Sequence, residues 1–176
     1  MLTTARLDLR PHRLSDLDAL AAIYGDAAVM RFIGGEPISR EELWNRLLRY
    51  HGHWALLGFG LWAVEESATG RLIGNVGFAD FHRGLGDDFD GVPEAAWVLG
   101  LEVQGKGHAA EAMTAALGWL DALGEGRSVC IINPANAASL RLAARLGYRV
   151  FAERAYRGAP TLLHERIAAG QRPIPR

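Results

Sequence analysis

A glycine-rich segment carries the most specific chemistry in this sequence. A largely apolar stretch ending near Val103 is followed by Gln-Gly-Lys-Gly-His-Ala at 104–109, which opens a long run with helical periodicity. The first amides of a helix have no partner inside the helix, and the helix dipole adds partial positive charge at that end. Two glycines there remove side chains, so that a phosphate can approach the backbone closely. The segment therefore predicts an anion site at a helix N-terminus.

Two nucleotide-binding motifs share parts of this pattern but fit it poorly. A Walker loop needs Ser or Thr directly after Gly-Lys to bind magnesium, whereas Lys106 is followed by Gly107. A dinucleotide fingerprint has a third glycine where this chain has Ala110, and it follows an early strand of a βαβ unit. A nucleotide-binding regulatory domain stays a rival hypothesis, which predicts binding of ATP or NAD.

The segments around the loop predict a mixed α/β domain. Period-two or continuous apolar patterns predict strands at 7–10, 61–64, 72–81, 94–103, 128–132, 148–153 and 161–167. Capping residues and helical periodicity predict helices that begin near Ser15 and at Ser39, and helices at 109–123 and 136–146. We expect one domain over residues 1–176, with helices packed on a central sheet.

Composition excludes several classes of protein. The formal net charge of −1 argues against a nucleic-acid-binding surface. No apolar run approaches the ~20 residues that span a bilayer, so we expect no membrane partner. Cys130 is the only cysteine, so no intrachain disulfide can form. A single thiol suits a reducing compartment, and the first residues lack the apolar core of a signal peptide, which together favour a cytoplasmic location.

Several motifs, in order along the chain, resemble the GNAT superfamily of N-acetyltransferases. Gln104-x-x-Gly107-x-Ala109 resembles the pyrophosphate loop of that family. The stretch 133–139, followed by Leu-Gly-Tyr at 146–148, resembles the end of the family's fifth strand and its next helix. Segments at 6–11, 15–16, 60–64 and 70–74 resemble the branch that contains the ribosomal-protein N-terminal acetyltransferases, which is RimJ- and RimL-like.

This resemblance implies a fold, a co-substrate and a set of contacts. The fold is α/β (α+β), a mostly antiparallel sheet of about seven strands, splayed between strands 4 and 5, with about four flanking helices. The pantetheine arm of acetyl-CoA would lie against the fourth strand, and its pyrophosphate would bind the loop amides. The enzyme would then acetylate an amine without a metal. The implied cofactor-binding residues are Leu99, Leu101, Val103, Gln104, Gly105, Lys106, Gly107, His108, Ala109, Ala110, Asn133 and Asn136.

The sequence departs from the family at the catalytic positions. Ala143 falls where many GNAT enzymes carry a tyrosine that protonates the leaving thiolate, and Ser139 is the nearest hydroxyl. Glu94 begins the fourth strand and is our candidate general base, with a solvated strand-end acid as the alternative. Ser139 could instead only cap or pack its helix. Because the tyrosine is missing, a non-catalytic acyl-CoA-binding sensor is a further rival to an enzyme.

The remaining polar residues leave the acceptor open. The acidic loop at 87–90 is either solvated or attracts a cationic acceptor. His51 and His53 have no partnering acid or thiol, so we expect no metal site. Cys130 lies in a predicted central strand and is expected to be a buried, inert thiol. The expected partners are acetyl-CoA and an amine, either a small molecule or a peptide N-terminus, and a homodimer is left open.

Overall fold

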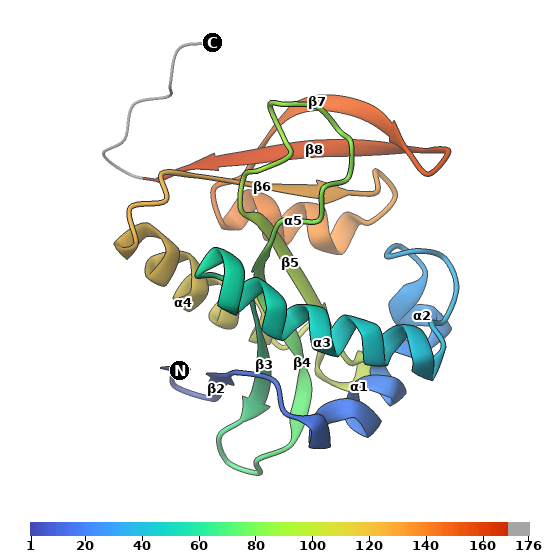
Figure 1. Cartoon of the computed structure of the whole chain (residues 1–176), viewed down its shortest axis with the longest axis vertical. Helices are drawn as coiled ribbons and strands as arrows, with labels where there is room; N and C mark the ends of the chain where they lie inside the picture. Colours follow the sequence, from blue (N-terminus) through green and yellow to red (C-terminus); the bar gives the residue numbers. More distant parts are fainter. Residues whose placement is uncertain (169–176) are drawn as a thin grey trace. The chain divides into compact units, whose positions relative to one another are not determined.

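The computed structural model describes residues 1–168 (Figure 1). These residues belong to two compact units. The first unit comprises residues 1–79 and 96–116, and the second comprises residues 80–95 and those from 117 onward. Within the described residues there are eight strands and five α-helices. None of these helices has the length and apolar character needed to cross a membrane. The assignment of one domain to residues 1–176 stays a prediction.

The first unit is built on an antiparallel β-meander. Strands β1 (Leu2–Thr3), β2 (Leu7–Arg10), β3 (Leu61–Glu66) and β4 (Leu72–Ala79) follow one another in the sheet. Strand β5 (Glu94–Leu99) is next to β4, and its residues from Ala96 onward belong to this unit. The Gly100 amide donates to the Ile73 carbonyl at 2.9 Å, which ties the end of β5 to β4.

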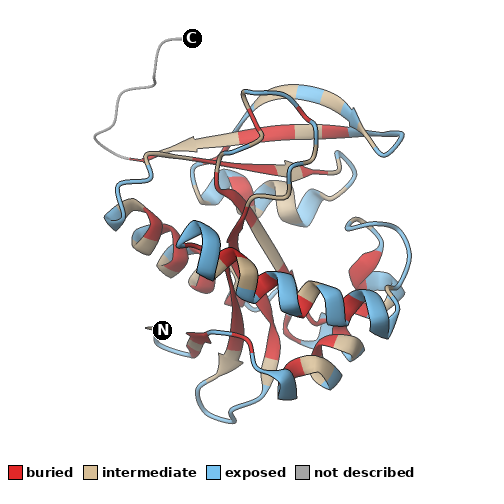
Figure 2. Ribbon diagram, in the orientation of Figure 1, coloured by how far each residue is buried: buried red, intermediate tan, exposed pale blue. Residues whose placement is uncertain are grey.

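Three helices of the first unit share one apolar core. Helix α1 (Leu17–Tyr24) is followed by α2 (Ala27–Met30) and α3 (Arg40–Leu57), and α1 and α3 lie side by side (Figure 1). Their buried side chains form a cluster with two strand residues, and the cluster includes Leu20, Met30, Leu43, Leu47, Leu61 and Val98. Figure 2 shows the resulting division of α3 into buried and exposed faces. Helix α3 begins as predicted, since Ser39 Oγ accepts the Glu42 amide at 3.1 Å.

The start of α1 differs from the prediction. Ser15 lies inside a short 3₁₀ turn, η1 (Leu14–Asp16), and the carboxylate that closes this turn belongs to Asp16, which accepts the Arg13 amide at 2.7 Å. Asp16 is 4 % exposed and forms a two-pronged ion pair with Arg10, at 2.8 and 2.7 Å. Burial acts to raise the pKa of Asp16, but the hydrogen bonds from Arg10 and Arg13 hold it below the ordinary 3.8.

Because of this pairing, Asp16→Asn should lower the free energy of unfolding at neutral pH by about 2 kcal/mol. A carboxyl with a lowered pKa stabilises the fold above its unfolded pKa, and the contribution is lost as pH falls through the folded pKa. The variant should therefore also lose part of the acid dependence of stability. Asp18 pairs with Arg40 at 2.7 Å but is 83 % exposed, so Asp18→Asn is the matched control and should change little. Urea titrations between pH 3 and 7 measure both, and equal effects of the two variants would contradict the argument.

The second unit is built on strands β6 (Arg127–Ile132), β8 (Ala159–Ile167) and β7 (Arg149–Tyr156), in that spatial order. The pairs β6–β8 and β8–β7 are antiparallel. The first residues of β5 add a parallel neighbour to β6, with a single register pair between Glu94 and Val129. Helix α5 (Ala137–Arg145) follows β6, and the core contains Leu85, Phe89, Val129 and Leu163.

The predicted class of fold is confirmed, and its strands and helices differ from the prediction chiefly in three ways. Residues 1–168 contain eight strands rather than about seven, because Leu2–Thr3 adds β1, and five α-helices rather than about four, because of the short α2. The predicted strand 94–103 ends at Leu99 instead. Residues Leu101–Val103 form a 3₁₀ turn, η2, in which the Val103 amide donates to the Gly100 carbonyl at 3.2 Å. Backbone groups used in this turn are not available to continue a strand.

Candidate functional site

The glycine loop lies where the sequence placed it, between η2 and helix α4 (His108–Ala122). Gly105 and Gly107 have φ angles of 74° and 84°, in the left-handed region that favours glycine. A Cβ built on Gly105 would meet nothing within 4 Å, and one on Gly107 would meet only Arg6 Nη2, at 3.6 Å. The space beside both glycines is therefore open, and their backbone can be approached. This arrangement fits a phosphate group at the N-terminus of α4.

Side chains hold the carbonyl groups that flank this loop. Gln104 Nε2 donates to the Leu99 carbonyl at 2.9 Å, and His108 Nδ1 lies 3.3 Å from the Val103 carbonyl. Arg6 Nη1 donates to the Lys106 carbonyl at 3.1 Å. The Glu111 amide donates to the Gly107 carbonyl at 3.0 Å, so the helical pattern starts at Gly107. Amides 108–110 precede this bond and belong to the orphan donors of a helix start.

Two residues predicted to lie on the strand beside pantetheine lie in a 3₁₀ turn instead. Leu101 and Val103 are in η2, not in β5, and the Leu101 carbonyl accepts the Gln104 amide at 3.1 Å. Leu99 ends β5, and its carbonyl accepts the Gln104 side chain. Of the predicted segment 99–103, only Leu99 therefore has strand geometry. Lys106 is exposed, whereas Ala109 and Ala110 are partly buried in the first turn of α4.

The asparagines predicted downstream belong to the second unit and bind backbone amides. Asn133 Oδ1 accepts the Ala135 amide at 2.9 Å, and Asn136 Oδ1 accepts the Ser139 amide at 3.1 Å. Asn136 is thus the N-cap of α5. The alternative that Ser139 itself caps this helix is wrong, because Ser139 lies in the first turn, three residues after the cap. Its side chain is partly buried.

No tyrosine within α5 supplies the acid that many family members use, and the nearest one is already engaged. Ala143 is fully buried in α5, and Tyr148 follows two residues after the C-cap of that helix. The Tyr148 hydroxyl lies 2.8 Å from Ser128 Oγ, and burial raises the pKa of Tyr148 well above its ordinary value. A buried hydroxyl with a raised pKa and a fixed partner is a poor proton donor to a leaving group.

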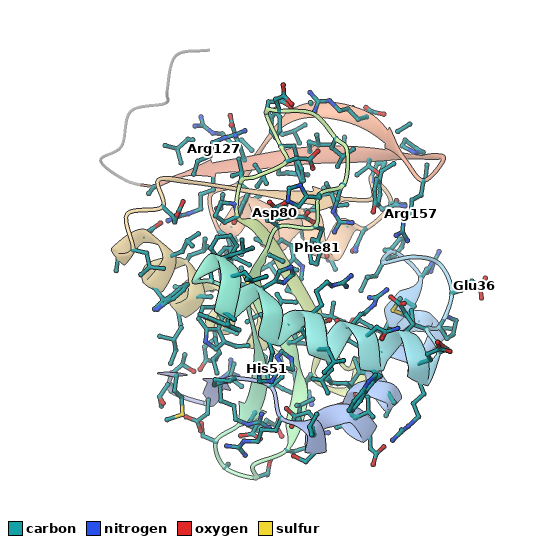
Figure 3. All side chains as sticks on the ribbon, in the orientation of Figure 1. Glu36, His51, Asp80, Phe81, Arg127 and Arg157 are labelled. Atoms are coloured by element: carbon teal, nitrogen blue, oxygen red, sulfur yellow. The ribbon has the colours of Figure 1, made fainter. Side chains whose placement is uncertain are left out.

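Glu94 is not the solvated acid that the simpler interpretation expected. It is 3 % exposed, and its two oxygens accept Arg83 Nε and Nη2, both at 2.7 Å. Arg83 also donates to the Tyr156 hydroxyl at 2.9 Å and lies 4.6 Å from the Phe81 ring centroid (Phe81 is labelled in Figure 3). Burial raises the pKa of Glu94 above its ordinary 4.5, although Arg83 acts in the opposite direction.

The acidic loop is mostly structural. Asp88 forms a two-pronged ion pair with Arg154, at 2.7 and 2.8 Å. Asp90 accepts the Arg83 and Leu85 amides, both at 3.0 Å. Asp87 is exposed. Attraction of a cationic acceptor by this loop would therefore depend chiefly on Asp87.

The remaining candidates have ordinary structural contacts. His51, labelled in Figure 3, lies 2.8 Å through Nε2 from the His12 carbonyl. Across residues 1–168, no group of three or more His, Cys, Asp or Glu is placed to hold a metal ion. Cys130 is buried, and burial raises the pKa of its thiol well above the ordinary value. The expectation that this thiol is buried is confirmed, and its raised pKa agrees with low reactivity.

Comparison with known proteins agrees with this geometry. The family model of the acetyltransferase (GNAT) domain matches residues 6–149. A protein assigned to the GnaT acetyltransferase family from Bordetella pertussis is 36 % identical, with 94 % of this chain and 98 % of that chain covered and a TM-score of 0.83. The chain therefore belongs to the GNAT acetyltransferase family.

More distant solved structures share the fold. A protein from Vibrio cholerae that is assigned as a ribosomal-protein-serine acetyltransferase is 20 % identical, with 94 % and 96 % of the two chains covered and a TM-score of 0.73. An acetyltransferase from Salmonella typhimurium, solved with its cofactor acetyl-CoA, is 23 % identical, with 98 % and 99 % covered and a TM-score of 0.72.

Family membership confirms three predictions from the sequence. The protein is an acetyltransferase, it uses acetyl-CoA, and ribosomal-protein acetyltransferases are among the proteins with its fold. A non-catalytic sensor is not favoured by these matches. Arg6 contacts the loop and Arg83 binds Glu94, and the sequence did not predict either role. The one available signal was that Arg6 opens the first of the family-like motifs.

Proposed function

We propose that this enzyme transfers the acetyl group of acetyl-CoA to a primary amine by direct attack within a ternary complex. The observation that carries the proposal is the open glycine loop at the start of α4, with Gly105 and Gly107 in left-handed conformations. Residues 104–110 would hold the pyrophosphate through their amides, and Leu99 would meet the pantetheine arm. Asn133 and Asn136 would contribute near the thioester, mainly by shaping the start of α5, since their side-chain oxygens bind backbone amides.

The proposed reaction needs one base and one donor from the protein. The amine nitrogen attacks the thioester carbonyl carbon, the carbon–sulfur bond breaks, and the coenzyme leaves as a thiolate. Glu94 would take the proton that the attacking nitrogen loses, directly or through water. Ser139 would donate a hydrogen bond to the departing sulfur. No covalent intermediate with the enzyme is needed.

The acceptor that we favour is the α-amino group of a protein. The resemblance of segments 6–11 and 70–74 to ribosomal-protein acetyltransferases supports it, as does the fold shared with the Vibrio cholerae enzyme. The test is release of coenzyme A thiol with a panel of peptides bearing each N-terminal residue, polyamines and amino acids, with products identified by mass spectrometry. The matched control is the same peptides with acetylated N-termini. Turnover of small amines alone would refute a protein acceptor, and no turnover with any amine would refute the proposed function.

If Glu94 is the base, the acidic limb of the pH profile of kcat/KM should report its protonation. Glu94→Gln should remove this limb and lower the plateau about tenfold, since water can replace a base in part. Arg83→Gln removes the hydrogen bonds that lower the pKa of Glu94, so the limb should move to higher pH. Asp87→Asn, in the same loop but exposed, is the control and should leave the limb in place. A limb unchanged in both Glu94→Gln and Arg83→Gln would exclude Glu94 as the base.

A further inference from the structure

An N-terminal arginine is bound to the glycine loop from outside it. Arg6 Nη1 donates to the Lys106 carbonyl at 3.1 Å, in the middle of the loop. Arg6 Nε donates to Glu111 Oε2 at 2.6 Å, and the Arg6 amide donates to Glu111 Oε1 at 2.9 Å. One guanidinium therefore bridges the loop and the first turn of α4, although about 100 residues of chain separate Arg6 from these partners.

Glu111, the acidic partner of Arg6, places a negative charge next to the site proposed for the pyrophosphate. It lies in the first turn of α4, the end of the helix at which we place the pyrophosphate. Burial acts to raise the pKa of Glu111, but hydrogen bonds from Thr4 and Arg6 hold it below the ordinary value, so the group is ionised at neutral pH. A carboxylate favours a helix start, but it also repels a phosphate bound there. Arg6 neutralises this carboxylate at contact distance, with Nη2 2.6 Å from Glu111 Oε2.

The geometry of the loop depends on the same contact. Lys106 lies between two glycines with φ angles of 74° and 84°, and glycines lose more conformational freedom on ordering than other residues. A hydrogen bond from a charged donor to the Lys106 carbonyl fixes the peptide between them. A loop that is ordered before the ligand arrives binds it without a further entropy cost.

We infer that Arg6 is a positioning residue for acetyl-CoA, which fixes the Lys106 carbonyl and neutralises Glu111 so that the loop amides are ready for the pyrophosphate. The inference rests on the proposed role of residues 104–110. The segment 6–11, which begins with Arg6, would thus help to bind the coenzyme. It would act through the loop and not by contact with the reacting atoms.

The test compares four variants by calorimetry with acetyl-CoA and by steady-state kinetics. Arg6→Ala should raise Kd and KM for acetyl-CoA about tenfold, which corresponds to the loss of a charge-assisted hydrogen bond, and should leave kcat unchanged. Arg6→Lys should recover little, because an ammonium cannot bridge two acceptors as a planar guanidinium does. Glu111→Gln should keep wild-type affinity or improve it, since Arg6 still holds Lys106 and the negative charge is gone. Adding Glu111→Gln to Arg6→Ala should restore only part of the affinity.

A merely structural role predicts the opposite result for Glu111→Gln. If Arg6 only anchors the N-terminal segment through Glu111, that variant should lose affinity and stability as Arg6→Ala does, and the inference is then overturned. Arg6→Ala with affinity within about twofold of wild type overturns it as well. Gly107→Asp is measured alongside. If Gly107→Asp binds acetyl-CoA normally, the loop is not the pyrophosphate site. If Gly107→Asp loses binding and Arg6→Ala binds normally, the loop assignment stands and only the role of Arg6 is refuted.

Discussion

Gly107→Asp is expected to raise the Kd for acetyl-CoA about 1000-fold, an effect of ~4 kcal/mol, while the protein stays folded. The φ angle of Gly107 is 84°, so a side chain there strains the backbone by about 1–2 kcal/mol. The new carboxylate would also occupy the open space beside the loop and bring negative charge to the site proposed for the pyrophosphate. The larger part of the effect therefore falls on binding rather than on folding.

The control must carry the same strain and charge at another place. Gly70, in the turn between β3 and β4, has a φ angle of 69°, and a Cβ there would meet nothing within 4 Å. Gly70→Asp should lose a similar amount of stability by thermal denaturation and keep its affinity for acetyl-CoA by calorimetry. Gly107→Ala separates the two contributions at the site, because it adds strain without charge. If Gly107→Asp and Gly70→Asp bind acetyl-CoA equally well, the loop does not bind the pyrophosphate.

The sequence was sufficient for features that local chemistry determines. The glycine loop and the helix start after it follow from the residue types themselves, as does the Ser39 cap of α3. The order of the other strands along the chain was also recovered, because each of them has an alternating or largely apolar pattern, whereas the two-residue β1 has none. These features depend on neighbours within a few residues along the chain.

The sequence was insufficient for contacts between side chains and partners that are not their neighbours along the chain. Glu94 has the pattern of a strand-end acid, and nothing local shows that Arg83 binds both of its oxygens and that it is buried. The end of β5 was placed too late for the same reason. Leu101 and Val103 continue an alternating apolar pattern, but the Gln104 side chain donates to the Leu99 carbonyl and the chain turns into η2. The contact of Arg6 with Lys106 depends on the whole arrangement of the first unit.

The second large effect expected is on the chemical step. Ser139→Ala should lower kcat about 100-fold, because a donor to the leaving thiolate stabilises the transition state more than the ground state. KM for acetyl-CoA should stay within about twofold of wild type for the same reason. The hydrogen bond that Ser139 makes with the Asn136 cap uses the backbone amide, so alanine retains it. Alanine is also the better helix former, and α5 should not be weakened.

Two further variants separate chemistry from helix stability. Asn136→Ala removes the cap of α5 and should cost about 1 kcal/mol of stability, with Ser139 still present. Ser139→Thr retains a hydroxyl and should keep more of kcat than Ser139→Ala does. Thiol release at saturating acetyl-CoA gives kcat, and chemical denaturation gives stability for each variant. Asn136→Ala could lose both activity and stability while Ser139→Ala keeps the wild-type kcat. In that case α5 supports the structure of the site and supplies no donor to the chemical step. The leaving thiolate must then be met by backbone donors or water, since the Tyr148 hydroxyl is buried against Ser128.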